Sequence, residues 1–370
     1  MTPLGLGFVG TGNIAGGYAR DVLTHPEIRL VAATDLDRDR AAIFAAEHCC
    51  RAHETLDDLL GDVAVDIVVN LTVHHAHYEV TKRALDAGRH VYSEKPLALR
   101  STEAAELVAL ARERGVRLGG SPSTFLGEAQ QTAAALIRSG RLGPVRAVYA
   151  DASWGRIETW HPAPAPFYDV GALVDVGVYP LTLATTMLGP ARSVRASAWY
   201  LKRERTTLDG TAFQIGSPDF VLAAINLDGG AVVRLTATFY VGPPARLRGS
   251  FEFHGDDASL ALGSFQEFDA AVEIGAFGTD YEPITPVRPP FRGIAWARGV
   301  AEMAAAIEEG RPHRASAEQA AHVVDILEAA ATSIAEDGRP IEVSSTFSPP
   351  ELMPWATIPA RPPDGDGRAG

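Results

Sequence analysis

A glycine-rich turn near the start of the chain constrains the fold more than any other feature. The apolar segment Leu4–Val9 has the composition of a β-strand, and the sequence Gly10–Ala15 (GTGNIA) follows it at once. A helix should come next, because Ile14, Tyr18 and Val22 recur on one helical face. Such glycines allow a tight turn and let the backbone approach a pyrophosphate at the helix N-terminus. The pattern predicts a dinucleotide site, with a purely structural corner as the alternative. The predicted cofactor contacts of this turn are Gly10, Gly12, Asn13 and Ile14.

Strands and helices continue to alternate over the first third of the chain. Further short apolar segments at 30–33, 66–71, 89–92 and 116–119 are separated by helical patterns. Repeated β–α–β units are typical of a parallel, doubly wound sheet. The sequence therefore predicts an α/β protein whose residues 1–122 form a Rossmann domain.

The remaining sequence predicts a different kind of domain over residues 123–345. Residues 233–239 alternate apolar and polar side chains, and Asp228-Gly229-Gly230 just before them is typical of a hairpin turn. We expect an α+β domain with a large, mainly antiparallel sheet and helices on one face. Late helices are predicted at 295–308 and after Ser316, where Gln319 completes a capping box. Residues 346–370, rich in Pro and Gly, should form an extended arm or a disordered tail.

Composition excludes several classes of partner. A formal net charge of −13 over 370 residues argues against nucleic acid or an anionic membrane, which both require clustered Lys and Arg. No apolar run appears long enough to span a bilayer, and no basic region precedes the first strand as in a signal peptide. The two adjacent cysteines, Cys49 and Cys50, should be free thiols, so we expect a cytoplasmic protein. The His and Cys residues near 48–53 and 74–77 lack zinc-site spacing, so no metal site is predicted.

Asp35, at the end of the second strand, bears on the choice of dinucleotide. A carboxylate there can accept hydrogen bonds from the adenine ribose and repels the 2′-phosphate of NADP. Arg38 and Arg40 follow closely and could partly offset that repulsion. NAD is the predicted cofactor, with NADP as the alternative.

Two further strings carry reactive groups. Lys95 follows a strand at the carboxyl edge of the sheet, and Pro96 favours an extended conformation that directs the ammonium into the crevice. In the second domain, Asp175 and Tyr179 are four residues apart in an apolar stretch, so a helix would place both on one buried face, kinked at Pro180. A buried carboxylate requires a partner, and Lys95 is a suitable one.

Taken together, these motifs resemble the Gfo/Idh/MocA oxidoreductase family, which includes glucose–fructose oxidoreductase and inositol dehydrogenase. The resemblance extends over nearly the whole chain to about Thr346. The matching motifs are GTGNIA at Gly10–Ala15, EKP at Glu94–Pro96, SPSTF at Ser121–Phe125, SGRLG at Ser139–Gly143 and DVGVY at Asp175–Tyr179. Most members carry His where this chain has Tyr179. With Tyr179, the chain resembles the branch of the family that includes dimeric dihydrodiol dehydrogenase, glucose–fructose oxidoreductase and certain xylose dehydrogenases.

The resemblance implies a role for each matched residue. Tyr179 would act as general acid/base while a hydride passes between substrate and nicotinamide, with Lys95 and Asp175 as its catalytic partners. A phenol with a pKa near 10 is a poor base, so we expect Lys95 to lower that pKa, at about 3–4 kcal/mol of differential interaction. Asp175 would hold Lys95 and bind a substrate hydroxyl. Residues expected beside the nicotinamide half of the cofactor are Asn70, Thr72, His77, Glu94 and Lys95. Trp160 and His161 are expected to contact the substrate, with a packed aromatic and a surface His as the alternative.

The predicted function is an NAD(P)-dependent oxidoreductase acting on a small carbohydrate, cyclic polyol or related hydroxylated ring. Among enzymes, the second hypothesis is a reductase or a dihydrodiol dehydrogenase. The alternative from another class is a non-catalytic NAD(P)-binding sensor or regulator of the same fold. The exposed sheet face predicts self-association as a homodimer or homotetramer.

Overall fold

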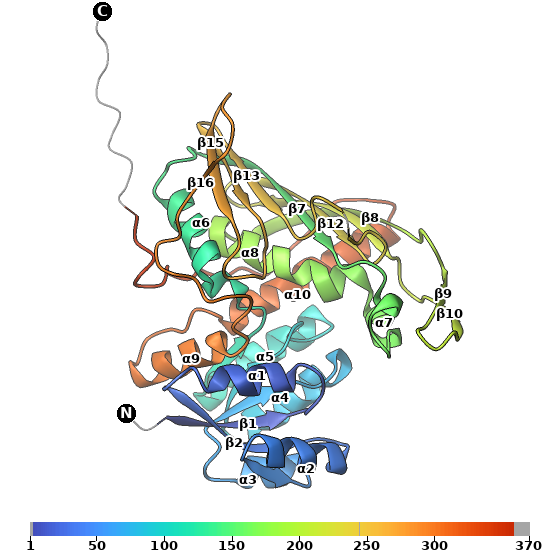
Figure 1. Cartoon of the computed structure of the whole chain (residues 1–370), viewed down its shortest axis with the longest axis vertical. Helices are drawn as coiled ribbons and strands as arrows, with labels where there is room; N and C mark the ends of the chain where they lie inside the picture. The colour runs from blue at the N-terminus through green and yellow to red at the C-terminus, as the bar shows by residue number, and fades with distance from the viewer. Residues whose placement is uncertain (1–2, 244, 359–370) are drawn as a thin grey trace, which may run out of the picture.

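Two β-sheets dominate the computed structural model, which describes residues 3–243 and 245–358 (Figure 1). A six-stranded sheet with its helices forms the lower part of the view, and a nine-stranded sheet backed by helices forms the upper part. This arrangement confirms the predicted α/β fold with a second, mainly antiparallel α+β domain.

The first sheet is entirely parallel, in the order β3-β2-β1-β4-β5-β6. Its strands are β1 (Leu4–Val9), β2 (Ile28–Thr34), β3 (Arg51–His53), β4 (Ile67–Asn70), β5 (His90–Ser93) and β6 (Leu118–Gly120). Every residue of β4 is buried, as expected of a strand covered by helices on both faces. The strand order reverses between β1 and β4, which opens a crevice at their carboxyl ends.

Local signals set the ends of the Rossmann helices. Asp37 caps one helix by accepting the backbone N–H of Arg40, and Thr55 caps another through Asp58. Gly115 ends a third in the left-handed conformation, with a φ of 67°. The helices are α1 (Ala15–Val22), α2 (Arg38–Glu47), α3 (Leu56–Gly61), η1 (His74–Ala76), α4 (His77–Asp86) and α5 (Ser101–Arg114).

The second sheet has the order β16-β15-β14-β13-β7-β12-β11-β8-β17. All its pairings are antiparallel except that of β7 with β12. The predicted hairpin turn joins β11 to β12, with Gly230 at a φ of 89°. The strands are β7 (Val145–Ser153), β8 (Ala191–Trp199), β11 (Phe220–Leu227), β12 (Val232–Thr238), β13 (Phe251–Gly255), β14 (Ala258–Leu262), β15 (Val272–Ala276), β16 (Glu282–Pro283) and β17 (Ile341–Glu342). A separate hairpin is formed by β9 (Glu204–Thr206) and β10 (Ala212–Gln214).

Helices cover one face of this sheet, and the other face is left open (Figure 1). The helix α9 (Arg298–Glu308) packs against β2 and β6 of the first sheet. The helices that cover the second sheet are η2 (Thr124–Leu126), α6 (Glu128–Arg138), α8 (Val178–Leu188) and α10 (Ala317–Ala335). The last of these packs against β8 and also against α5 and β6 of the Rossmann domain. Ser316 caps it by accepting the N–H of Gln319, as predicted, but the Gln319 side chain donates to Thr182 and Thr186 of α8. The preceding helix begins at Arg298 and not at 295.

The stretch from 165 to 188 is distorted in its middle. It follows the short η3 (Ile157–Thr159) and runs from α7 (Ala165–Ala172) into a π-helical segment, η4 (Leu173–Gly177), and then into α8. The prediction of regular helical spacing between Asp175 and Tyr179 is therefore wrong, because Asp175 lies in the π-helical turn. By length and composition this stretch could also cross a membrane, contrary to expectation. Its most apolar window is 89% buried inside the structure, as in a core helix.

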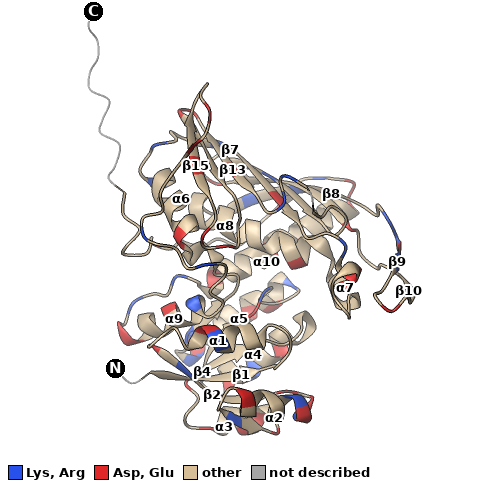
Figure 2. Ribbon diagram, in the orientation of Figure 1, with Lys and Arg blue, Asp and Glu red and all other residues tan. Residues whose placement is uncertain are grey.

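The C-terminal segment forms an extended arm as far as residue 358. Its backbone accepts hydrogen bonds from Arg138 at Pro350 and from Arg314 at Glu351, and Ala356 is fully buried. The rest of the predicted tail, 359–370, lies outside the described residues. Cys49 and Cys50 carry free thiols, and acidic and basic residues are interspersed over both domains (Figure 2).

Candidate active site

A cleft of about 1140 Å³ opens along the carboxyl ends of the Rossmann strands and reaches the second domain. Of the residues predicted to form the site, all but Asn70 line this cleft. The side that we call the Rossmann wall includes Gly10, Gly12, Asn13, Ile14, Asp35, Thr72, His74, His77, Glu94 and Lys95. The opposite side, here called the aromatic wall, consists of Trp154, Trp160, His161, Ala163, Pro166 and Phe167. Asp175 and Tyr179 lie in the same cleft.

The glycine turn has the shape that a dinucleotide pyrophosphate requires. Gly10 has a φ of 93°, and a Cβ there would lie 2.8 Å from the carbonyl oxygen of Leu71. A Cβ on Gly12 would meet no atom within 4 Å, since this residue faces the open cleft. Ile14, at the start of α1, makes no side-chain cap hydrogen bond. The turn therefore leaves room for an anionic ligand, which the positive end of the helix dipole would stabilise.

Asp35 is held by donors from its own domain. Its Oδ2 accepts from the Thr11 backbone N–H at 2.7 Å, and its Oδ1 accepts from Arg40 Nη2 at 2.6 Å. Burial alone would raise its pKa, but hydrogen bonds from Arg40, Thr11 and Asp37 hold the pKa of Asp35 below its usual value. Arg40 is half-exposed at the mouth of the cleft, beside a carboxylate whose oxygens are already engaged.

Asn70 was expected to contact the cofactor, but it is fully buried beneath the Rossmann wall. Its amide nitrogen donates to the His77 carbonyl and to Thr81, and its oxygen accepts from the Thr72 hydroxyl at 2.6 Å. All the hydrogen bonds of the Asn70 amide are therefore made to groups inside the protein. Asn70 positions Thr72, which does face the cleft. His77 lines the cleft as well, and its ring lies between the carbonyl oxygens of Pro96 and Thr72.

Lys95 and Asp175 form an ion pair across the two domains. Lys95 Nζ donates to Asp175 Oδ1 at 2.7 Å and to the Asp175 carbonyl at 2.9 Å. Burial opposes both charges, yet the Lys95 ammonium and His74 lower the pKa of Asp175 to about 2. Asp175, Tyr179 and Glu94 likewise outweigh burial and raise the pKa of Lys95. The pair therefore stays ionised across the neutral range.

Tyr179 lies beside this pair, and Lys95 Nζ is 5.2 Å from the centroid of its ring. Burial raises the pKa of Tyr179 to about 12, although the Lys95 ammonium acts in the expected, lowering direction. The expected net lowering of the phenol pKa is therefore wrong in this structure. The side chain is almost completely enclosed. The free energy lost by desolvating a phenolate there therefore exceeds the free energy gained from one nearby ammonium. Tyr179 is thus a neutral proton donor near pH 7.

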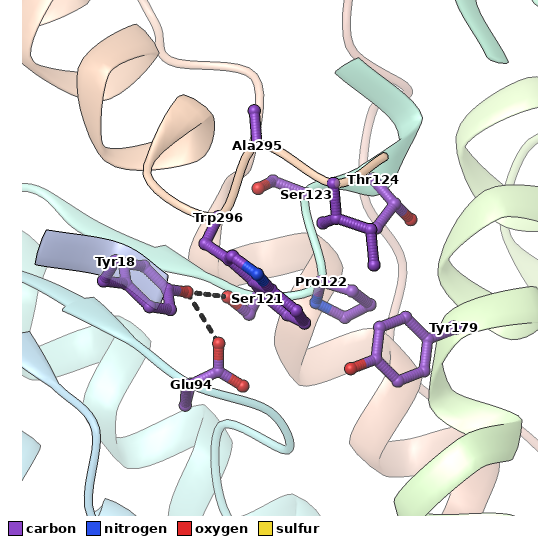
Figure 3. Close-up of a pocket in the computed structure, with 10 residues that line it drawn as sticks. Tyr18, Glu94, Ser121, Pro122, Ser123, Thr124, Tyr179, Ala295 and Trp296 are labelled. Atoms are coloured by element: carbon purple, nitrogen blue, oxygen red, sulfur yellow. Dashed lines mark hydrogen bonds between the residues drawn. The ribbon is translucent and has the colours of Figure 1, made fainter. Parts of the chain in front are cut away.

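The inner end of the site joins α1, β5 and α8 (Figure 3). The Tyr18 hydroxyl donates to Glu94 Oε1 at 2.6 Å and also approaches Ser121 Oγ at 3.0 Å. Tyr179 faces these groups across a small space of about 10 Å³, room for about one water molecule, which Trp296 also lines.

Sequence reasoning missed several of these contacts. His74 Nε2 lies 3.7 Å from Asp175 Oδ1, although this histidine was weighed only as a metal ligand. Its position directly after β4, at the ligand-binding edge of the sheet, was the available signal. Trp296 comes from a coil far along the chain, and nothing in its local sequence indicates the cleft.

The aromatic wall is a cluster of rings from the loop before α7 and from the first turn of α7. Trp160 contacts Trp154 at a centroid distance of 6.0 Å and Phe167 at 6.2 Å, and His161 contacts Phe167 at 4.9 Å. Trp160 remains 45% exposed. Sequence reasoning selected Trp160 and His161 but not their aromatic neighbours.

A buried charged network lies behind this wall. Arg205 is fully buried, and its guanidinium donates to Glu158 Oε1 at 2.9 Å and to Asp219. The hydroxyl of Tyr168, in α7, donates to Glu158 as well. The network ties the β9 hairpin to the loop and helix that carry the aromatic wall. No motif in the sequence predicted it.

Within residues 3–243 and 245–358, no group of three or more His, Cys, Asp or Glu side chains could hold a metal ion.

Two family models match the chain within residues 4–261. A model described as "Oxidoreductase family, NAD-binding Rossmann fold" matches residues 4–120, and the GFO/IDH/MocA C-terminal domain model matches residues 130–261.

Among individual proteins, the chain is 34% identical over 195 residues to a dTDP-3,4-didehydro-2,6-dideoxy-alpha-D-glucose 3-reductase of Streptomyces antibioticus, covering 50% of this chain and 56% of the reductase. It is 29% identical over 209 residues to a trans-1,2-dihydrobenzene-1,2-diol dehydrogenase of Macaca fascicularis, covering 55% and 62%. The chain thus spans little more than half the length of these relatives. An NAD-binding oxidoreductase structure from Klebsiella pneumoniae superposes with a TM-score of 0.81 at 23% identity over 93% of this chain and 100% of that one, which shows the shared fold.

Proposed function

Because the chain belongs to the Gfo/Idh/MocA oxidoreductase family, we propose that it transfers a hydride between NAD(P) and a hydroxyl-bearing carbon of a sugar, cyclic polyol or related ring. The observation that carries this proposal is the Lys95–Asp175 pair beside Tyr179, in the same cleft as the glycine turn. A dinucleotide would be held by the turn at Gly10–Ile14 and by Thr72 and Glu94 farther along the Rossmann wall. When bound, the nicotinamide supplies a hydride acceptor or donor.

The protein groups handle the proton that accompanies this hydride. In the reducing direction, the neutral Tyr179 phenol donates its proton to the forming alkoxide, and the Lys95 ammonium stabilises the negative charge that remains. In the oxidising direction, the phenolate form of Tyr179 accepts the proton of the substrate hydroxyl. Asp175 keeps Lys95 charged and in place, and it offers a carboxylate to a neighbouring substrate hydroxyl.

A non-catalytic NAD(P)-binding sensor is the alternative. A sensor has no need for an ion pair that costs desolvation on both sides and lies directly beside an enclosed phenol. The arrangement therefore favours turnover over binding alone.

The experiment is a substrate screen on the full chain. Sugars, cyclic polyols and dihydrodiols are offered with NAD⁺ and NADP⁺, and the corresponding ketones with the reduced cofactors, while the ultraviolet absorbance of the reduced nicotinamide is followed. We expect turnover with at least one hydroxylated ring. Dinucleotide binding without turnover across the panel would support the sensor.

We also propose that the open face of the nine-stranded sheet binds a second copy of the chain. Tyr149, Leu222, Val232 and Trp199 lie on this face and are 38–46% exposed. Such exposed apolar area is typical of an interface. Sedimentation equilibrium should give a dimer or tetramer, and a monomer at micromolar concentration would contradict the proposal.

A further inference from the structure

The cleft has more room than one ligand needs. Its volume of about 1140 Å³ exceeds the ~300–1,000 Å³ of most single-ligand sites. The features that fit a dinucleotide all lie on the Rossmann wall. The aromatic wall therefore faces space left for the second ligand, and Trp160 exposes nearly half of its surface there. Aromatic surface of this kind favours apolar groups and ring faces.

Within residues 3–243 and 245–358, no cationic side chain joins the rings of the aromatic wall, although three arginines lie close to it in the fold. Arg156, from the same loop, stacks on Tyr240 with its guanidinium 4.6 Å from the ring centroid. Arg203 lies 3.4 Å from the centroid of Tyr200, and Arg205 is buried in its carboxylate network. None of the three lines the cleft in the part of the chain that the structure describes.

The start of α7 could have supplied several backbone donors to a phosphate, but proline removes two of them. Pro164 and Pro166 have no N–H, and the N–H of Phe167 donates to the carbonyl of Pro164. Among the described residues, a phosphate placed here would find no Arg or Lys side chain on the aromatic wall and, at the helix start, a single backbone donor at Ala165. Two phosphates of a nucleoside diphosphate sugar would remain without a charged partner.

His161 adds a single directional polar group to the wall. Its Nδ1 accepts the backbone N–H of Ala163 at 3.0 Å. A neutral ring with this bond carries its hydrogen on Nε2, which can donate to a substrate oxygen.

We propose that the substrate is an uncharged hydroxylated ring with an alkyl or aryl substituent that lies on the aromatic wall, and not a nucleoside diphosphate sugar. The proposal rests on the oxidoreductase function above, because it assumes that the reacting carbon lies at Lys95 and Tyr179. It separates this chain from its dTDP-sugar reductase relative despite 34% identity.

The test compares three forms of the same sugars. Glucose, galactose and xylose are each offered unsubstituted, as phenyl glycosides and as UDP-linked forms, with saturating NAD⁺. We expect kcat/KM for the phenyl glycoside to exceed that for the free sugar by about tenfold or more, and the UDP form to give no gain. Trp160→Ala should reduce the phenyl preference to about twofold, whereas Phe277→Ala, a truncation of a 91% exposed ring outside the cleft, should keep it.

Binding is measured in parallel, so that the inference is tested even without turnover. Quenching of tryptophan fluorescence in the NAD⁺ complex should report phenyl glycoside binding, weakened about tenfold by Trp160→Ala. Phenyl glycosides that bind but are not turned over would retract the oxidoreductase proposal alone. A UDP-linked form that is preferred, or a phenyl preference that survives Trp160→Ala, would overturn the inference while leaving the oxidoreductase proposal intact. The inference also fails if no phenyl glycoside is bound or turned over.

Discussion

The two walls of the cleft are built in different ways. The Rossmann wall is formed where regular strands end: Gly10 follows β1, Thr72 follows β4, and Lys95 follows β5. Because the strands are parallel and in register, their ends meet at one edge. The aromatic wall comes from an irregular loop that a buried arginine, Arg205, holds from behind.

The difference teaches where specificity can change without loss of the fold. The Rossmann wall binds largely through backbone and strand-end groups, so its geometry is inherent in the sheet. The aromatic wall depends on side chains of a loop and on their anchoring network, so substitutions there can alter the ligand while the sheet remains unchanged.

The largest effect should come from breaking the reactive end of the cleft, where Lys95 of the Rossmann wall meets Tyr179 of α8. We expect Tyr179→Phe and Lys95→Ala to lower kcat by about 10²- to 10⁴-fold, since the first removes the transferable proton and the second its electrostatic partner. Binding of the reduced cofactor, measured by fluorescence titration, should change only a few-fold. Lys82→Ala, which removes a lysine paired with Glu106 outside the cleft, is the matched control and should keep full activity. Near-normal kcat in either cleft variant would refute the assignment.

The next largest effect tests the support of the aromatic wall. Arg205→Met removes the partner of two buried carboxylates, and breaking such a pair costs about 3–5 kcal/mol of unfolding free energy. Urea unfolding should show this loss. Arg146→Met removes an arginine from an exposed pair with Asp256 and should leave the midpoint of urea unfolding nearly unchanged, because water screens the pair. Equal costs for the two variants would show that the network is no more than a surface contact.

Sequence patterns predicted the Rossmann wall better than the aromatic wall, for a physical reason. Strand-end residues can be located from strand and turn signals alone, which is why Asp35, Thr72 and Lys95 were found. Asn70 was wrongly predicted to contact the cofactor. It ends a fully buried strand, and the sequence pattern of such a strand does not show whether a side chain forms its hydrogen bonds inside the protein or with a ligand. The π-helical turn at Asp175, the partners of Arg205 and the reach of Trp296 depend on long-range packing, which no local pattern encodes.

Tyr179 lies where the two walls meet, and its protonation state can be tested by the pH dependence of the oxidation and reduction reactions. Since burial raises the pKa of Tyr179 to about 12, its proton-donating form predominates throughout the neutral range. Reduction, which needs the phenol, should have a kcat/KM that stays flat between about pH 6 and 9. Oxidation, which needs the phenolate, should rise about tenfold per pH unit over the same range. Oxidation that levels off near pH 7 while reduction declines would mean a lowered pKa in the complex and would contradict this description.

The smallest effect concerns cofactor choice at the far end of the Rossmann wall. Asp35 holds Arg40 through a direct ion pair and also accepts from Thr11. Asp35→Ala removes the carboxylate that repels a 2′-phosphate and at the same time releases Arg40 to bind one. We expect the ratio of kcat/KM for NADP to that for NAD to rise about tenfold. Asp37→Ala is the matched control, because Asp37 also lies near Arg40 but caps α2; it should cost about 1 kcal/mol of stability and leave the ratio unchanged. If both variants shift the ratio equally, the general loss of negative charge sets the cofactor preference. Asp35 would then not be the group that distinguishes NAD from NADP.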